Sequence, residues 1–110
     1  MEWSFADCQD VAWRYAESVV ARVVPLWEDE LRAAEFAGEG RARVRARVRV
    51  DAAGELRELI IREADFPELE GFARLAFERA VPLPAPPRDG ACDLTDMPLD
   101  LALDAQVLRY

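Results

Sequence analysis

Lysine, histidine and asparagine are absent from this chain of 110 residues, and only two cysteines occur in it. The lack of histidine removes the most common general base and the most common metal ligand of proteins. Cys8 and Cys92 are far apart, so the C-x-x-C spacing that is typical of zinc sites is missing as well. The short G-x-G of Gly38 and Gly40 is not a phosphate-binding loop. We therefore expect no enzymatic activity, no metal and no cofactor.

Two questions about the rare residues stay open at this stage. Cys8 and Cys92 are interpreted as free or buried thiols, with a disulfide between them as the alternative if the domain works in an oxidising compartment. Trp3, Trp13 and Trp27 are interpreted either as anchors of the core or as an interface patch.

Positive charge is scarce relative to negative charge, since the chain has 14 arginines and 22 acidic residues and a net charge of -8. Nonspecific nucleic-acid binding needs a basic surface, so we expect no nucleic-acid partner. No apolar run approaches the roughly 20 residues that span a bilayer, so no membrane span is expected in this chain. The first ten residues carry acids and lack the basic segment of a secretory signal. A cytoplasmic location is expected if Met1 is the native start, and a periplasmic one if the chain is part of an anchored or exported protein.

Residues 41–50 read RARVRARVRV and predict a strand that is buried on one face only. The members of the arginine face are Arg41, Arg43, Arg45, Arg47 and Arg49, and those of the apolar face are Ala42, Val44, Ala46, Val48 and Val50. A slip of one residue would bury the guanidinium groups, so this pattern also determines the register of a sheet.

Helical periodicity precedes this strand, and a second strand follows it. The spacing predicts a helix over 5–23, which Pro25 stops or kinks, and a short second helix from there to Ala34. A turn at 51–54 leads to a strand over 55–63, with Leu59 and Ile61 pointing inward and Leu56 out of phase at a bulge. If Val50 opposes Glu55, then Arg47 lies opposite Glu58.

The rest of the chain predicts one more helix and one more strand. Asp65 is expected to cap a helix with Pro67 in its first turn. Its apolar stripe consists of Leu69, Phe72, Ala73, Ala76, Phe77 and Ala80. The proline-rich segment 81–90 favours an extended connection. Alternation over 97–105 then predicts a third strand, with its leucines on one face and Asp100, Ala102 and Asp104 on the other.

The order of these elements predicts an α+β fold. The tight turn makes the first two strands antiparallel neighbours, and a right-handed crossover places the third strand beside the first. The result is a three-stranded antiparallel-type sheet in the order 2-1-3, with helices packed on its Ala/Val face. Residues 1–110 are expected to form one domain, on which the helical segment 1–35 packs.

The same topology places acidic side chains beside the row of arginines. Glu58 from the second strand and Asp100 and Asp104 from the third would flank the row, which predicts a hydrated face that neutralises itself. A face that binds anions or an acidic partner is the alternative.

With its segments in this order, the chain resembles the family of TolA and TonB C-terminal domains. The resemblance rests on FAGEGRARVRARVRVDAAGELRELII (36–61), DFPELEGFARLAFERAVPLPAPP (65–87) and PLDLAL (98–103). It lies in the succession and spacing of these segments, because V-D-x-x-G alone occurs in many hairpins. Three departures are the missing anchor and spacer, the positions of the cysteines, and the tryptophan-containing N-terminal segment.

The resemblance implies a non-enzymatic protein-interaction domain at the periplasmic end of an envelope energy transducer. It implies binding by β-strand addition at the edge formed by the third strand. The expected partner-binding residues are Leu99, Asp100, Leu101, Ala102, Leu103 and Asp104. Leu101→Pro is expected to abolish such binding by removing a backbone donor. Pairing of two copies through this edge stays open.

Two other classes of function stay open beside this one. The first is a small acidic cytoplasmic adaptor or immunity-type inhibitor, which would bind a basic partner with a steep dependence on salt. The second is an enzyme with an unrecognised pair of carboxylates.

Overall fold

The computed structural model describes residues 5–33, 40–89 and 92–107. These residues form helices α1 (Phe5–Ala33) and α2 (Glu68–Ala80), three long strands, β1 (Gly40–Val50), β2 (Leu56–Ala64) and β5 (Leu99–Val107), and two short strands, β3 (Arg88–Asp89) and β4 (Cys92–Asp93). Of the described helices, none is long and apolar enough to cross a membrane.

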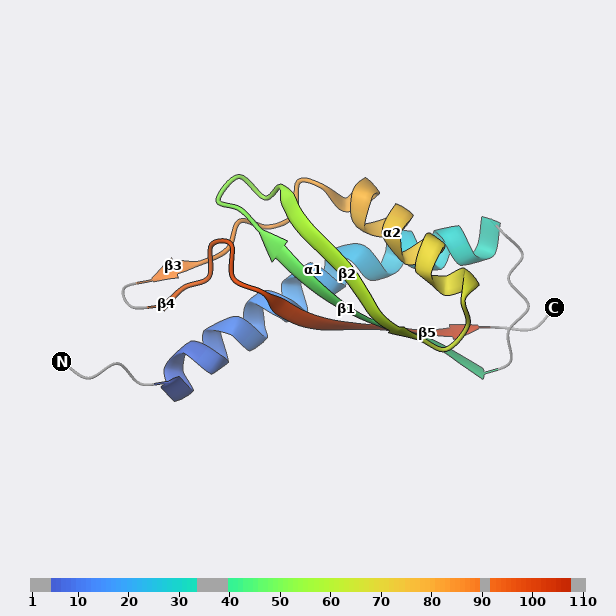
Figure 1. Cartoon of the computed structure of the whole chain (residues 1–110), viewed down its shortest axis with the longest axis horizontal. Coiled ribbons are helices and arrows are strands. Elements are labelled where there is room, and N and C mark those ends of the chain that lie inside the picture. Colours follow the sequence, from blue (N-terminus) through green and yellow to red (C-terminus); the bar gives the residue numbers. More distant parts are fainter. Residues whose placement is uncertain (1–4, 34–39, 90–91, 108–110) are drawn as a thin grey trace.

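The long strands form one sheet in the order β2-β1-β5, and β1 is antiparallel to both of its neighbours (Figure 1). The predicted α+β fold and strand order are therefore confirmed. The two short strands pair separately as a small hairpin. Helix α1 packs against α2 and β5, whereas α2 also packs against β1 and β2.

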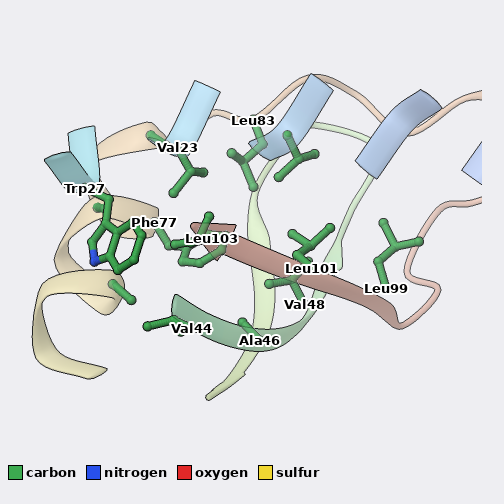
Figure 2. Close-up of a cluster of buried hydrophobic side chains, with 14 of the residues drawn as sticks. Val23, Trp27, Val44, Ala46, Val48, Phe77, Leu83, Leu99, Leu101 and Leu103 are labelled. Carbon is green, nitrogen blue, oxygen red and sulfur yellow. The ribbon is translucent and has the colours of Figure 1, made fainter. Parts of the chain in front are cut away.

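Buried side chains fill the layer between the helices and one face of the sheet (Figure 2). The apolar row of β1, from Ala42 to Val50, is buried in this layer, as predicted. The predicted stripe of α2 faces it, with Phe72 partly buried and the other members buried. The opposite face of the sheet carries the arginines and is open to solvent.

The three tryptophans do not form one group. Trp27 is fully buried in the core, and its indole Nε1 has no hydrogen-bond partner among the described residues. Trp13 is 66% exposed on α1. Trp3 lies outside the described residues.

The predicted stop of the first helix at Pro25, with a separate second helix after it, is wrong. Helix α1 runs as one helix from Phe5 to Ala33 with Pro25 inside it. Proline removes one helical hydrogen bond, but Val23 and Trp27 are fully buried on either side of it. Packing of both halves against the same core therefore outweighs the local cost.

The predicted register between the first two strands also needs correction. Val50 pairs with Leu56, and Glu58 pairs with Arg49 rather than with Arg47. The turn accounts for one residue of the shift at Glu58, and the extra residue Arg57 on β2 accounts for the other. A second extra residue, Arg62, shifts the pairing once more between Ile61 and Glu63. The predicted bulge beside Leu56 is confirmed, and Leu59 and Ile61 pack against the core as expected.

The predicted cap of the second helix is wrong as well. Pro67 occupies the N-cap position of α2, and no side chain caps the helix. Asp65 instead continues the pairing of β2 with β1. Its amide donates to the Arg43 carbonyl at 3.0 Å, and its carboxylate accepts from the Arg43 amide at 3.1 Å. The Asp65 carboxylate therefore bonds β1 and is not free to cap α2.

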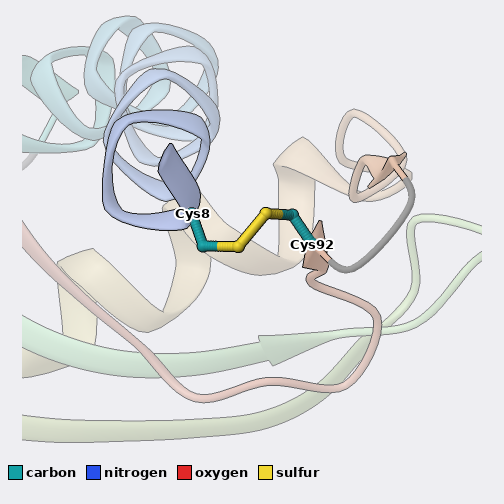
Figure 3. Close-up of a disulfide and its surroundings, with 2 residues drawn as sticks. All are labelled: Cys8 and Cys92. Atoms are coloured by element: carbon teal, nitrogen blue, oxygen red, sulfur yellow. A yellow bond between two sulfur atoms is a disulfide. The ribbon is translucent and has the colours of Figure 1, made fainter. Parts of the chain in front are cut away.

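A disulfide joins Cys8 on α1 to Cys92 on β4, with the two Cα atoms 5.4 Å apart (Figure 3). The interpretation as free thiols is thus wrong, and the alternative holds. Further along α1, the Tyr15 hydroxyl donates to the Pro84 carbonyl at 2.8 Å. The first half of α1 is therefore held to the proline-rich segment and to the short hairpin that follows it.

Candidate partner-binding edge

All six residues that the sequence singled out for partner binding lie in β5, which is an edge strand of the sheet. Leu99, Leu101 and Leu103 are buried, whereas Asp100, Ala102 and Asp104 are exposed on the open face. The side chains of the leucines therefore belong to the core. What β5 offers a partner is its backbone edge and the three exposed side chains.

Hydrogen bonds at both ends of β1 show which way the backbone groups of β5 point. The Arg43 amide and carbonyl bond Asp65 at the end of β2, so these groups face β2. The Val50 carbonyl accepts from the Asp96 amide at 2.9 Å, so it faces the segment that enters β5. Successive backbone groups of a strand alternate in direction, so the even-numbered residues of β1 bond to β5.

The pairing of β1 with β5 then shows which residues of β5 direct their backbone groups toward β1 and which direct them outward. Val44 pairs with Leu103, and Ala46 pairs with Leu101, so the backbone groups of these leucines bond to β1. The backbone groups of Asp100, Ala102 and Asp104 point toward the outer edge instead. Proline at position 101 would remove a hydrogen bond to β1 and would leave the outward amides of β5 in place. Leu101→Pro therefore disturbs the sheet itself and does not test binding at the outer edge.

On the open face, acidic and basic side chains form alternating columns. We define the arginine row as the residues of β1 whose side chains the structure describes on this face: Arg43, Arg45, Arg47 and Arg49. The ion pairs are Arg43–Asp104 at 3.3 Å, Arg45–Glu63 at 3.9 Å, Arg47–Asp100 at 3.1 Å and Arg49–Glu58 at 3.7 Å. The side chain of Arg41 is outside those described. The predicted neutralisation by Glu58, Asp100 and Asp104 therefore holds, with Glu58 facing a different arginine.

The surroundings of Asp100 favour its charged form. The hydrogen bond from Arg47 lowers the pKa of Asp100 below its ordinary value, and the nearby charges of Arg62 and Arg45 act in the same direction. The Asp100 side chain is 70% exposed even so, and that of Asp104 is 33% exposed. Both side chains are therefore accessible to solvent.

Sequence reasoning missed Glu63 and Arg62, because the bulge that places them on this face depends on the pairing of β1 with β2. A shallow hollow lies on the open face beside these residues, lined by Arg45, Arg47, Arg62, Glu63, Asp100 and Ala102 among others. Within the described part of the chain, no group of cysteine and acidic side chains is arranged to hold a metal ion.

The architecture defines a class of small α+β domain with two helices on one face of a three-stranded sheet and a long strand at its edge. A family model described as TonB C terminal matches residues 13–100, and the chain belongs to this family. The family consists of non-enzymatic protein-interaction domains of envelope energy transduction and is periplasmic in context. No curated protein and no solved structure matches the chain.

Proposed function

We propose that this domain binds an extended segment of an envelope protein, and that the segment adds to the sheet as a fourth strand along β5. The observation that carries the proposal is the direction of the β5 backbone. The amides and carbonyls of Asp100 and Ala102 point away from β1, toward the side where the sheet order ends. Strands at the end of a sheet order are templates for a further strand.

The chemistry of the chain supports binding rather than catalysis. The carboxylates on the open face are ion-paired with arginines, and the chain contains no histidine to act as a general base. Backbone hydrogen bonds would supply affinity, and side chains on both faces of the added strand would supply selectivity.

A proline substitution at one position of β5 tests this proposal. Ala102→Pro removes an outward amide while leaving the bonds to β1 in place, and edge strands tolerate proline where the amide faces outward. The matched control is Ala102→Thr, which keeps the amide and suits a strand. The probe is a short synthetic peptide that alternates valine and threonine, and its affinity is measured by fluorescence anisotropy.

We expect Ala102→Pro to weaken binding of this peptide at least tenfold and Ala102→Thr to change it little. Hydrogen exchange provides a second readout on the unmodified domain. The Ala102 amide should become protected when the peptide is added, whereas the Leu101 amide is already protected by β1. Peptide binding that leaves exchange at Ala102 unchanged would show that the partner binds elsewhere.

A further inference from the structure

We propose that the partner strand alternates basic and apolar residues, with the basic side chains beside Asp100 and Asp104 and the apolar side chains beneath α1. This inference rests on the proposed strand addition and specifies the chemistry of the segment that is added. Two independent features of the structure carry it, one on each face of the sheet.

The first feature is the order of the charged columns on the open face. Crossing the sheet from β2 to β5, the columns are mixed (Glu58, Glu63 and Arg62), basic (the arginine row) and acidic (Asp100, Asp104). The next strand would lie about 4.8 Å beyond β5, so its side chains would be direct neighbours of the two aspartates and more distant from the arginines. A basic residue continues the alternation, whereas an acidic residue would oppose like charge. The net charge of -8 also attracts basic segments at long range.

The second feature is a row of small and branched apolar residues along one flank of α1. One flank faces α2, because the Arg22 guanidinium donates to the Ala80 carbonyl and Glu30 forms an ion pair with Arg79. Since α2 lies over β1 and β2 and α1 lies against β5, the opposite flank of α1 is on the side of the outer edge.

Helical spacing identifies the residues of that outer flank. A row at i, i+4 spacing lies on the side of the helix opposite Arg22 and Glu30. It consists of Ala12, Ala16, Val20 and Val24, all of which are only partly buried. Residues of an added strand that alternate toward this side would cover the row, and burial of apolar surface favours apolar side chains there. In the proposed arrangement, the backbone edge, the acidic column and the apolar flank would together contact the added strand.

One register of pairing with a second copy of this chain is unfavourable. Antiparallel pairing of two β5 strands about Ala102 would place Asp100 of one copy opposite Asp104 of the other. Like charges directly opposed across a pair of strands are unfavourable. A basic partner strand meets no such opposition and is the occupant that we propose.

Two peptides and two double variants test the charge pattern. The peptides have the alternating valine framework, one with arginine and one with glutamate at the alternate positions. Asp100→Asn with Asp104→Asn removes the acidic column, and Glu68→Gln with Glu78→Gln removes the same charge from exposed positions of α2. We expect the native domain to prefer the arginine peptide, and the column variant to bind it roughly 2- to 30-fold more weakly than the native domain does. The α2 variant should bind like the native domain apart from a small general charge effect.

A matched pair of substitutions in α1 tests the apolar flank. Ala16→Gln places a longer polar side chain beside the edge, and Ala21→Gln places the same side chain on the exposed side of the same helix. We expect only Ala16→Gln to weaken binding of the arginine peptide, by several-fold. Equal effects of the two substitutions would exclude the flank from the interface.

The outcomes separate this inference from the proposal on which it rests. If the native domain binds both charged peptides equally well, or if the column variant keeps the full preference for arginine that the α2 variant shows, the charge pattern is wrong while strand addition stands. If Ala102→Pro leaves the affinity of the valine–threonine peptide unchanged, strand addition itself fails. A β5-linked dimer of the native domain in sedimentation experiments would show that the like charges do not exclude self-association.

Discussion

Loss of the Cys8–Cys92 disulfide should cost this domain a large part of its stability. The bridge spans a sequence separation of 84 and ties the beginning of α1 to β4. A cross-link of this length restricts almost the whole unfolded chain, whereas the folded chain is also held by the Tyr15–Pro84 hydrogen bond and the buried face of α1. The variant Cys8→Ser with Cys92→Ser should therefore still fold, with reduced stability.

The magnitude follows from the entropy of closing the loop. For the separation of 84 residues, the loop-entropy relation gives about 4.5 kcal/mol at 25 °C, and measured bridges contribute typically about 2–4 kcal/mol. A domain of this size has a total stability of about 5–15 kcal/mol. A loss of about 3 kcal/mol should lower the midpoint of thermal unfolding by roughly 10–20 °C.

Urea unfolding with and without a phosphine reductant measures the effect. The reductant should lower the free energy of unfolding of the native chain to that of the double serine variant, and it should leave the variant unchanged. Mass spectrometry of the oxidised protein should show the loss of two thiol hydrogens. If the reductant has no effect on the native chain, or if the serine variant is as stable as the oxidised protein, the reasoning about the bridge is refuted.

Three other predictions concern backbone conformation and pH. Gly54 has a φ of 84°, and a Cβ there would collide with the Leu83 carbonyl oxygen, whereas a Cβ at Gly71 meets nothing within 4 Å. In urea unfolding, Gly54→Ala should therefore destabilise the domain by at least about 1–2 kcal/mol. Gly71→Ala should stabilise it by about 0.5–1 kcal/mol in the same assay. Backbone hydrogen bonds from Glu55 and Ala53 lower the pKa of Asp51. The contribution of Asp51 to stability is therefore present above its unfolded pKa of about 4 and is lost as the pH falls through the lowered value. The free energy of unfolding of Asp51→Asn should depend less on acid pH than that of the native domain, and an unchanged acid dependence would contradict this. Burial raises the pKa of Tyr15 to about 12, so the stability of the domain should fall as the pH rises above the unfolded pKa of about 10. Tyr15→Phe should lack this alkaline loss of stability. Tyrosinate absorbance of the native domain should show that Tyr15 ionises at a higher pH than a free tyrosine.

Local patterns in the sequence predicted most of the fold. The alternation of β1, the turn at Gly54 and the apolar stripe of α2 each depend on a periodicity that short-range geometry imposes. The strand order followed from the handedness of crossover connections. These features are confirmed, and in each case the apolar face that the periodicity predicts is buried in the same core.

The details that failed are those in which distant contacts compete with local preference. Pro25 lies inside α1 because Val23 and Trp27 pack on both sides of it. Asp65 bonds the backbone of β1 and so does not cap α2. The extra residue Arg62 of β2 changed the partner of Arg45, and the sequence of β2 signals the bulge beside Leu56 but not this second one.

For the candidate site, the sequence by itself determined that 99–104 alternates leucine with exposed small or acidic residues, because a half-buried strand requires that period. It also determined that acids would lie beside the arginine row. Only the tertiary structure decided which backbone groups of β5 point outward, because this depends on the pairing of β1 with both of its neighbours. The joining of Cys8 to Cys92 was decided there too, since it brings together segments that are remote in the chain.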